Sequence, residues 1–163
     1  QILSGLGTAA IELCELLGEA CASGEANIDN VYACEIDAHA IAFMLQLAEQ
    51  KGSVGMRPAC MYTNYLSDYC DVRKLPTVDL LFITLLCESH CSLHNGHANV
   101  RRDMDDPTTR LMAQKTSALL KGGDKVAKVV IFENLENWHE SGAFDDIVDG
   151  LTSGGFRQVL DWP

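Results

Sequence analysis

The fold of this chain is decided by VDLLFITLLCESHCS, residues 78–92. Val78 to Thr84 is a nearly continuous apolar run with β-branched and aromatic members, which is typical of a strand buried on both faces of a parallel sheet. A polar stretch that contains Cys87 follows this strand. A second apolar run, residues 129–132, ends in the same way at Glu133. In an open α/β sheet, ligands bind just outside the carboxyl ends of the strands, so Cys87 and Glu133 are candidates for one site.

Strand and helix patterns alternate along the rest of the chain. Apolar runs bounded by turn residues predict further strands at 1–3, 31–36, 59–63 and 156–162, and a loop is predicted at 19–29. Apolar residues at helical spacing predict helices at 9–17, 38–50, 107–122 and 144–151. This alternation predicts an α/β fold with a mostly parallel, twisted sheet and helices on both faces, in a single domain over residues 1–163.

Composition limits the class of protein. Of the 163 residues, 47% are hydrophobic and 21% are charged, which is ordinary for a soluble globular domain. No apolar run approaches the length of a membrane span, and no secretory signal opens the chain. The seven cysteines are irregularly spaced, which indicates reduced thiols in a cytoplasmic protein. Because the chain starts at Gln1 inside an expected strand, we expect upstream residues to be missing.

The net charge of −11 counts against unaided binding to nucleic acid. The local counterweight is a group of cations between positions 101 and 128, namely Arg101, Arg102, Arg110, Lys115, Lys121, Lys125 and Lys128. The alternative interpretation of this basic window is an ordinary solvated surface with uneven charge.

Two further places suggest ligand binding. Ser4, Gly5, Leu6 and Gly7 form a glycine turn between an expected strand and an expected helix, where the backbone can approach a ligand and a helix N-terminus offers free N–H groups. A plain tight turn explains this pattern equally well. Glu35 and Asp37 end the predicted strand at 31–36, where an acidic residue commonly holds ribose hydroxyls. Asp37 also suits the N-cap of the helix at 38–50, and both roles can hold together.

The segment after the strand at 78–84 permits a metal site as an alternative. Thiols and imidazoles, which suit zinc, gather within residues 87–97 as Cys87, His90, Cys91, His94 and His97. The spacing matches no familiar finger, and a buried strand-end cysteine is the plainer explanation of Cys87. The segment from 88 to 107 is long for a loop in a compact domain, and such loops are usually functional or disordered.

The order of these motifs resembles that of the DNA cytosine-5 methyltransferases. That family carries a Phe-x-Gly-x-Gly turn, a Glu-x-Asp, a Pro-Cys-Gln loop, an Asp-x-Arg before a helix and a Glu-Asn-Val. The matching pieces here are SGLG at 4–7, EID at 35–37, Cys87, Asp106 with Arg110, and ENL at 133–135. The resemblance implies a Rossmann-like, S-adenosylmethionine-dependent methyltransferase fold and C5 methylation of cytosine in DNA, as in restriction-modification enzymes.

The resemblance also implies a role for each residue. The cofactor S-adenosylmethionine would contact Ser4, Gly5, Leu6, Gly7, Glu35, Ile36 and Asp68. Glu35 would hold its ribose and Asp68 its adenine amine. A target cytosine would be flipped out of the duplex. Cys87 would attack C6, Glu133 would hydrogen-bond or protonate N3, and Arg110 would help to hold the base.

Departures from the family pattern leave a second interpretation open. Leu85 and Leu86 stand where the family has prolines, Glu88 stands where it has Gln, and the later Gln-x-Arg-x-Arg strand and target-recognition region are absent. The chain is therefore expected to be either a whole enzyme or part of a split or truncated one. DNA is expected to bind this acidic chain weakly, and a second subunit is expected to supply target recognition. The alternative is a catalytically inactive Rossmann-like module that binds cofactor or a protein partner.

Overall fold

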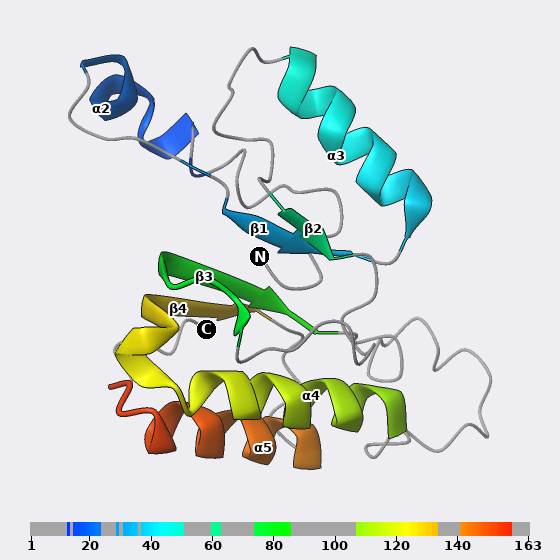
Figure 1. Cartoon of the computed structure of the whole chain (residues 1–163), viewed down its shortest axis with the longest axis vertical. Coiled ribbons are helices and arrows are strands. Elements are labelled where there is room, and N and C mark those ends of the chain that lie inside the picture. The colour runs from blue at the N-terminus through cyan, green and yellow to red at the C-terminus, as the bar shows by residue number, and fades with distance from the viewer. Residues whose placement is uncertain are drawn as a thin grey trace. The chain divides into compact units, whose positions relative to one another are not determined.

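The computed structural model describes residues 13, 15–23, 29, 31–35, 37–50, 60–62, 74–85, 107–133 and 141–157. The chain divides into two compact units, Gln1–Ser67 and Asp68–Pro163 (Figure 1). Both units combine helices with a pair of parallel strands. The protein is therefore a mixed α/β protein, as the alternation of patterns predicts.

The first unit contains two short strands and a long helix. Its described elements are α2 (Gly18–Ser23), β1 (Tyr32–Cys34), α3 (Ala38–Gln50) and β2 (Cys60–Tyr62). Strands β1 and β2 are parallel, with Tyr32 opposite Cys60. On α3 the residues Ala40, Met44 and Ala48 are buried at intervals of one helical turn, which gives the helix one buried face.

One prediction for this unit is wrong. Residues 19–29 were expected to form a loop, but Gly18–Ser23 is helical. Glu19 lies in the first turn, where a negative side chain is favourable to the helix dipole, and Ala20 and Ala22 are strong helix formers. The small, acidic composition that suggested a loop is therefore also compatible with a short helix.

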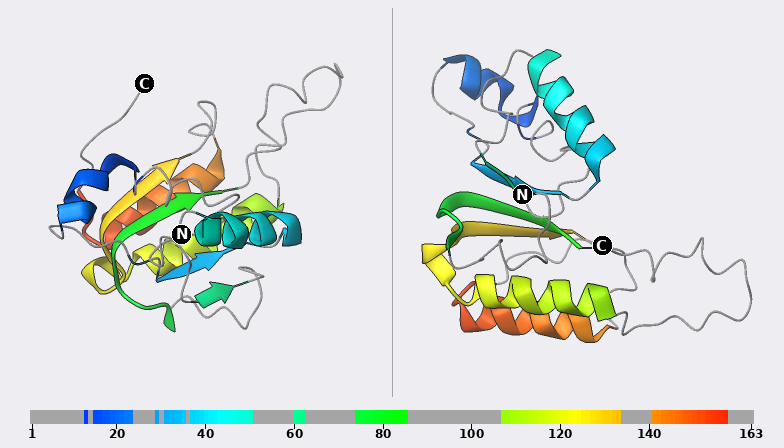
Figure 2. Two further views of the ribbon diagram at one scale, coloured as in Figure 1. Left: turned by 90° about the horizontal axis from the view of Figure 1, so that it is seen from above. Right: turned by 45° about the vertical axis from the view of Figure 1, so that its right-hand side comes forward.

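The second unit is a strand–helix–strand–helix arrangement. Its elements are β3 (Val78–Thr84), α4 (Pro107–Leu120), the 3₁₀ turn η5 (Gly123–Lys125), β4 (Ala127–Glu133) and α5 (Gly142–Ser153). Strands β3 and β4 are parallel, and their register runs from Val78 opposite Ala127 to Thr84 opposite Glu133. Figure 2 shows the two strands pointing in the same direction.

The two faces of the β3–β4 pair differ in burial. Leu81 and Ile83, at alternate positions on one face, are fully buried. On the other face Val129 and Ile131 are 54% and 44% exposed. Helices α4 and α5 lie side by side on one side of this strand pair (Figure 1). The expected burial of β3 on both faces is thus only partly met, because Leu80 and Phe82 are half-buried.

Helices α4 and α5 approach each other closely through small residues. A Cβ added at Gly150 would lie 2.7 Å from the Ser117 Cα, and one added at Gly154 would lie 2.1 Å from the Leu120 carbonyl oxygen. The contact positions increase together on the two helices, from Ser117 to Leu120 and from Gly150 to Gly154. Helices α4 and α5 therefore run in the same direction. The buried residues of α4 include Thr109, Met112, Ala113, Thr116, Ser117, Leu119 and Leu120.

The two described cysteines, Cys34 and Cys60, are free thiols. This agrees with the expectation of reduced cysteines at these two positions. None of the described helices combines the length and the apolar character that crossing a bilayer requires.

Candidate functional site

The carboxyl ends of β3 and β4 lie at the same edge of their sheet. Thr84 and Glu133 are Cα partners in the last pair of the register. Side chains that are directly paired in neighbouring strands point to the same face of a sheet, so both project to the face that carries Val129 and Ile131. Glu133 is exposed, which leaves its carboxylate accessible to a ligand.

A buried carboxylate follows β1 in the first unit. Glu35 is only 7% exposed, and its Oε1 accepts a hydrogen bond of 3.0 Å from the backbone N–H of Asp37. Glutamate is rarely buried unless it is paired, because burial removes the carboxylate from water. A carboxylate offers two oxygens with about four acceptor positions.

Asp37 caps the helix that follows. Its Oδ1 accepts a hydrogen bond of 2.8 Å from the backbone N–H of His39, and its carbonyl oxygen accepts one of 2.9 Å from Ile41. The first bond satisfies a backbone donor that a helix start leaves without an intrahelical partner. The predicted capping role of Asp37 is confirmed. The backbone N–H of the same residue also binds the Glu35 carboxylate.

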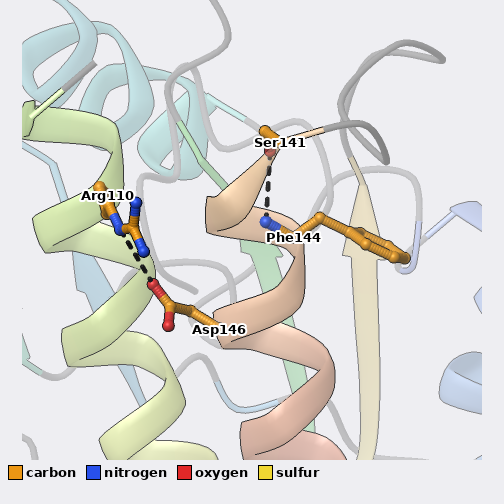
Figure 3. Close-up of polar contacts among 4 residues, drawn as sticks. All are labelled: Arg110, Ser141, Phe144 and Asp146. Atoms are coloured by element: carbon orange, nitrogen blue, oxygen red, sulfur yellow. Dashed lines mark hydrogen bonds and ion pairs between the residues drawn. The ribbon is translucent and has the colours of Figure 1, made fainter. Parts of the chain in front are cut away.

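Arg110 lies in the first turn of α4 and faces α5 (Figure 3). Its Nε is 3.9 Å from Oδ2 of Asp146, and the two side chains are 46% and 29% exposed. The same close-up shows Ser141, whose hydroxyl accepts a hydrogen bond of 3.2 Å from Phe144 N–H and caps α5. The contact with Asp146 was not foreseen, because no pattern in the sequence says which faces of two helices meet.

Two other cations of the basic window also pair with carboxylates. Lys121 Nζ is 2.8 Å from Asp149 Oδ2, and Lys128 pairs with Asp79 on the neighbouring strand. The hydrogen bond from Lys121, its positive charge and a hydrogen bond from Ser153 lower the pKa of Asp149. The hydrogen bond and the charge of Asp79 raise the pKa of Lys128. These pairs reduce the local positive charge that would favour nucleic acid.

The remaining predicted site residues lie outside the described part of the chain. They are Ser4, Gly5, Leu6, Gly7, Ile36, Asp68 and Cys87. The alternative zinc ligands at positions 87–97 lie outside it as well. Within the described ranges, no group of three His, Cys, Asp or Glu side chains is arranged to hold a metal ion.

Comparison with known proteins gives no match: no family model, no curated protein and no solved structure matches this chain. A functional assignment therefore depends on the sequence motifs and on the geometry of the described strand ends.

Proposed function

We propose that this chain is an S-adenosylmethionine-dependent cytosine-C5 methyltransferase, or the catalytic part of one, with a Rossmann-like fold. The observation that carries the proposal is the register of β3 and β4, which ends both strands at one edge with Thr84 opposite Glu133. Cys87 follows Thr84 by three positions in the sequence, and a chain of that length spans at most about 11 Å. In the proposed mechanism the Cys87 thiol would act within reach of Glu133.

The residue types suit the chemistry. The Cys87 thiolate would add to C6 of a flipped cytosine, since cysteine is the nucleophile least handicapped at neutral pH. Glu133 would hydrogen-bond or protonate N3, which draws electrons from the ring and favours that addition. The electron pair then available at C5 would attack the methyl group of the bound cofactor, so that the new carbon–carbon bond would form as the methyl–sulfur bond breaks and S-adenosylhomocysteine leaves. Loss of the C5 proton and elimination of the thiolate would restore the aromatic ring and free Cys87.

The cofactor fit rests on Glu35. It is a buried carboxylate at the carboxyl end of β1, the place where an acidic residue commonly holds ribose hydroxyls. Ser4, Gly5, Leu6, Gly7, Ile36 and Asp68 would complete that site. S-adenosylmethionine would supply the methyl group that is transferred to C5.

Arg110 has a less direct place in this proposal. Its Nε lies 3.9 Å from Asp146 Oδ2, at the long end of the range for an ion pair. As the motif implies, Arg110 would help to hold the target base from the first turn of α4.

A cofactor-binding or partner-binding module without activity is the second candidate. The observation that favours it is the acidic residue Glu88 directly after Cys87, which opposes ionisation of the thiol. The pairing of Arg110, Lys121 and Lys128 with carboxylates favours it too, since DNA would meet fewer unpaired cations. If the chain is the methyltransferase, it would form one methyltransferase-like domain, and a second subunit would supply target recognition.

The first test is calorimetric binding of S-adenosylhomocysteine to the full chain. We expect the wild type to bind and Glu35→Ala to lose about tenfold or more in affinity, because the ribose acceptor is gone. Glu49→Ala, which removes an exposed carboxylate at the other end of α3, is the control and should bind like the wild type. A folded wild type that does not bind would refute the methyltransferase assignment.

The second test addresses the nucleophile. With S-adenosylmethionine present and at low salt, duplex DNA that contains 5-fluorocytosine should form a covalent adduct with the wild type, because fluorine at C5 cannot be lost as a proton and so blocks the elimination step. Intact-mass analysis should show that Cys87→Ser abolishes the adduct, whereas Cys34→Ser, which alters a buried thiol of β1, retains it. Methyl transfer that survives Cys87→Ser would exclude the covalent mechanism.

A further inference from the structure

The start of α3 and the end of β1 are connected through one residue. Asp37 uses its side chain to cap α3 and its backbone N–H to hold Glu35 Oε1, at 2.8 Å and 3.0 Å respectively. Its carbonyl oxygen also accepts the first intrahelical bond, from Ile41. The direction of the N–H that contacts Glu35 is therefore set by the same bonds that begin the helix.

This arrangement limits how Glu35 can move. Glu35 is only 7% exposed, so few other orientations are open to its side chain. A glutamate that is fixed before a ligand arrives loses less side-chain entropy on binding than a mobile one. The Asp37 cap, two positions away, thus contributes to the orientation of the carboxylate without contacting the ligand itself.

We propose that Asp37 is a positioning residue for the ribose-binding carboxylate of Glu35, so that capping of α3 and affinity for the cofactor are coupled. This inference rests on the proposed function. It deepens that proposal, because Asp37 then acts on S-adenosylmethionine through Glu35 and not by direct contact. A cap with only a structural role would change the stability of α3 and leave affinity unchanged.

The experiment is calorimetric titration of S-adenosylhomocysteine into the full chain for the wild type, Asp37→Ala and Asp37→Asn. Asparagine keeps the capping oxygen and removes the charge. We expect Asp37→Ala to weaken binding about fivefold, the equivalent of about one lost hydrogen bond. Asp37→Asn should restore the affinity to near the wild-type value.

Ala42→Gly is the matched control for helix stability. Ala42 is exposed in the interior of α3, and glycine there weakens the helix about as much as loss of a cap. This variant should lower the melting temperature as Asp37→Ala does, while its affinity remains that of the wild type.

The outcomes separate the two proposals. The positioning role is overturned if Asp37→Ala binds as tightly as Ala42→Gly while Glu35→Ala has lost binding. In that case the cofactor site remains intact. A folded wild type that does not bind, or Glu35→Ala with full affinity, would overturn the cofactor site and the positioning role with it. Weak binding by Asp37→Ala, rescued by Asp37→Asn, supports both.

Discussion

At the residue scale, the exposed pair of Lys121 and Asp149 makes stability depend on pH. The lowered pKa of Asp149 means that the folded state prefers the ionised carboxylate more strongly than the unfolded chain does. The pair therefore stabilises the protein above the ordinary carboxyl pKa. This contribution is lost as the pH falls through the lowered pKa of the folded state.

The corresponding prediction concerns Asp149→Asn. As the pH falls below the ordinary carboxyl pKa and through the lowered pKa of Asp149, the wild type should lose this contribution. The difference in melting temperature between wild type and variant should therefore shrink toward zero as the solution is acidified. Thermal melts followed by circular dichroism between neutral and acidic pH would measure this. In a Lys121→Gln background, which lacks the partner cation, the same substitution should show a smaller pH-dependent difference. A constant difference at every pH would contradict the assignment.

At the scale of secondary-structure elements, the contact between α4 and α5 depends on the absence of a side chain at Gly150. A methyl group there would overlap the backbone of Ser117, whose Cα and carbonyl oxygen would lie at 2.7 Å and 2.9 Å. Gly150→Ala should therefore destabilise the protein by about 1–3 kcal/mol, although alanine is the better helix former. Urea denaturation would measure the change.

Gly18→Ala provides the comparison for that variant. Gly18 begins α2, and a Cβ added there meets no atom within 4 Å. This substitution should be neutral or slightly stabilising, since alanine has less freedom to lose on folding. Equal stabilities of Gly150→Ala and Gly18→Ala would show that α4 and α5 can separate without cost.

The elements also show what the sequence could predict. The bounds of α3 match the prediction, Ala38–Gln50, because its periodicity and its Asp37 cap are local signals. Strand β3 also matches, at Val78–Thr84. The helix Gly18–Ser23 was missed, since short acidic segments carry weak local preference. The Arg110–Asp146 contact could not be predicted, because it depends on packing between helices distant in sequence.

At the scale of the whole molecule, negative charge governs the encounter with DNA. The net charge is −11, and Arg110, Lys121 and Lys128 of the basic window already contact carboxylates. We expect the isolated chain to bind duplex DNA more weakly than about 100 µM at physiological salt, the weak limit for non-specific binders. Fluorescence anisotropy would test this, with binding expected to strengthen as salt is lowered. Tight binding at physiological salt would show that the chain needs no partner for DNA contact.

The parallel pairing of β3 and β4 also has a consequence for folding kinetics. The Thr77 hydroxyl donates to the Lys125 carbonyl oxygen across 48 positions of the sequence, just where the two strands begin. Joining such distant segments closes a long loop and costs chain entropy before the ladder can compensate for it. Helices form within microseconds, whereas non-local pairing of this kind is slow. The sheet edge that holds Glu133 is therefore among the last features to assemble as the chain folds.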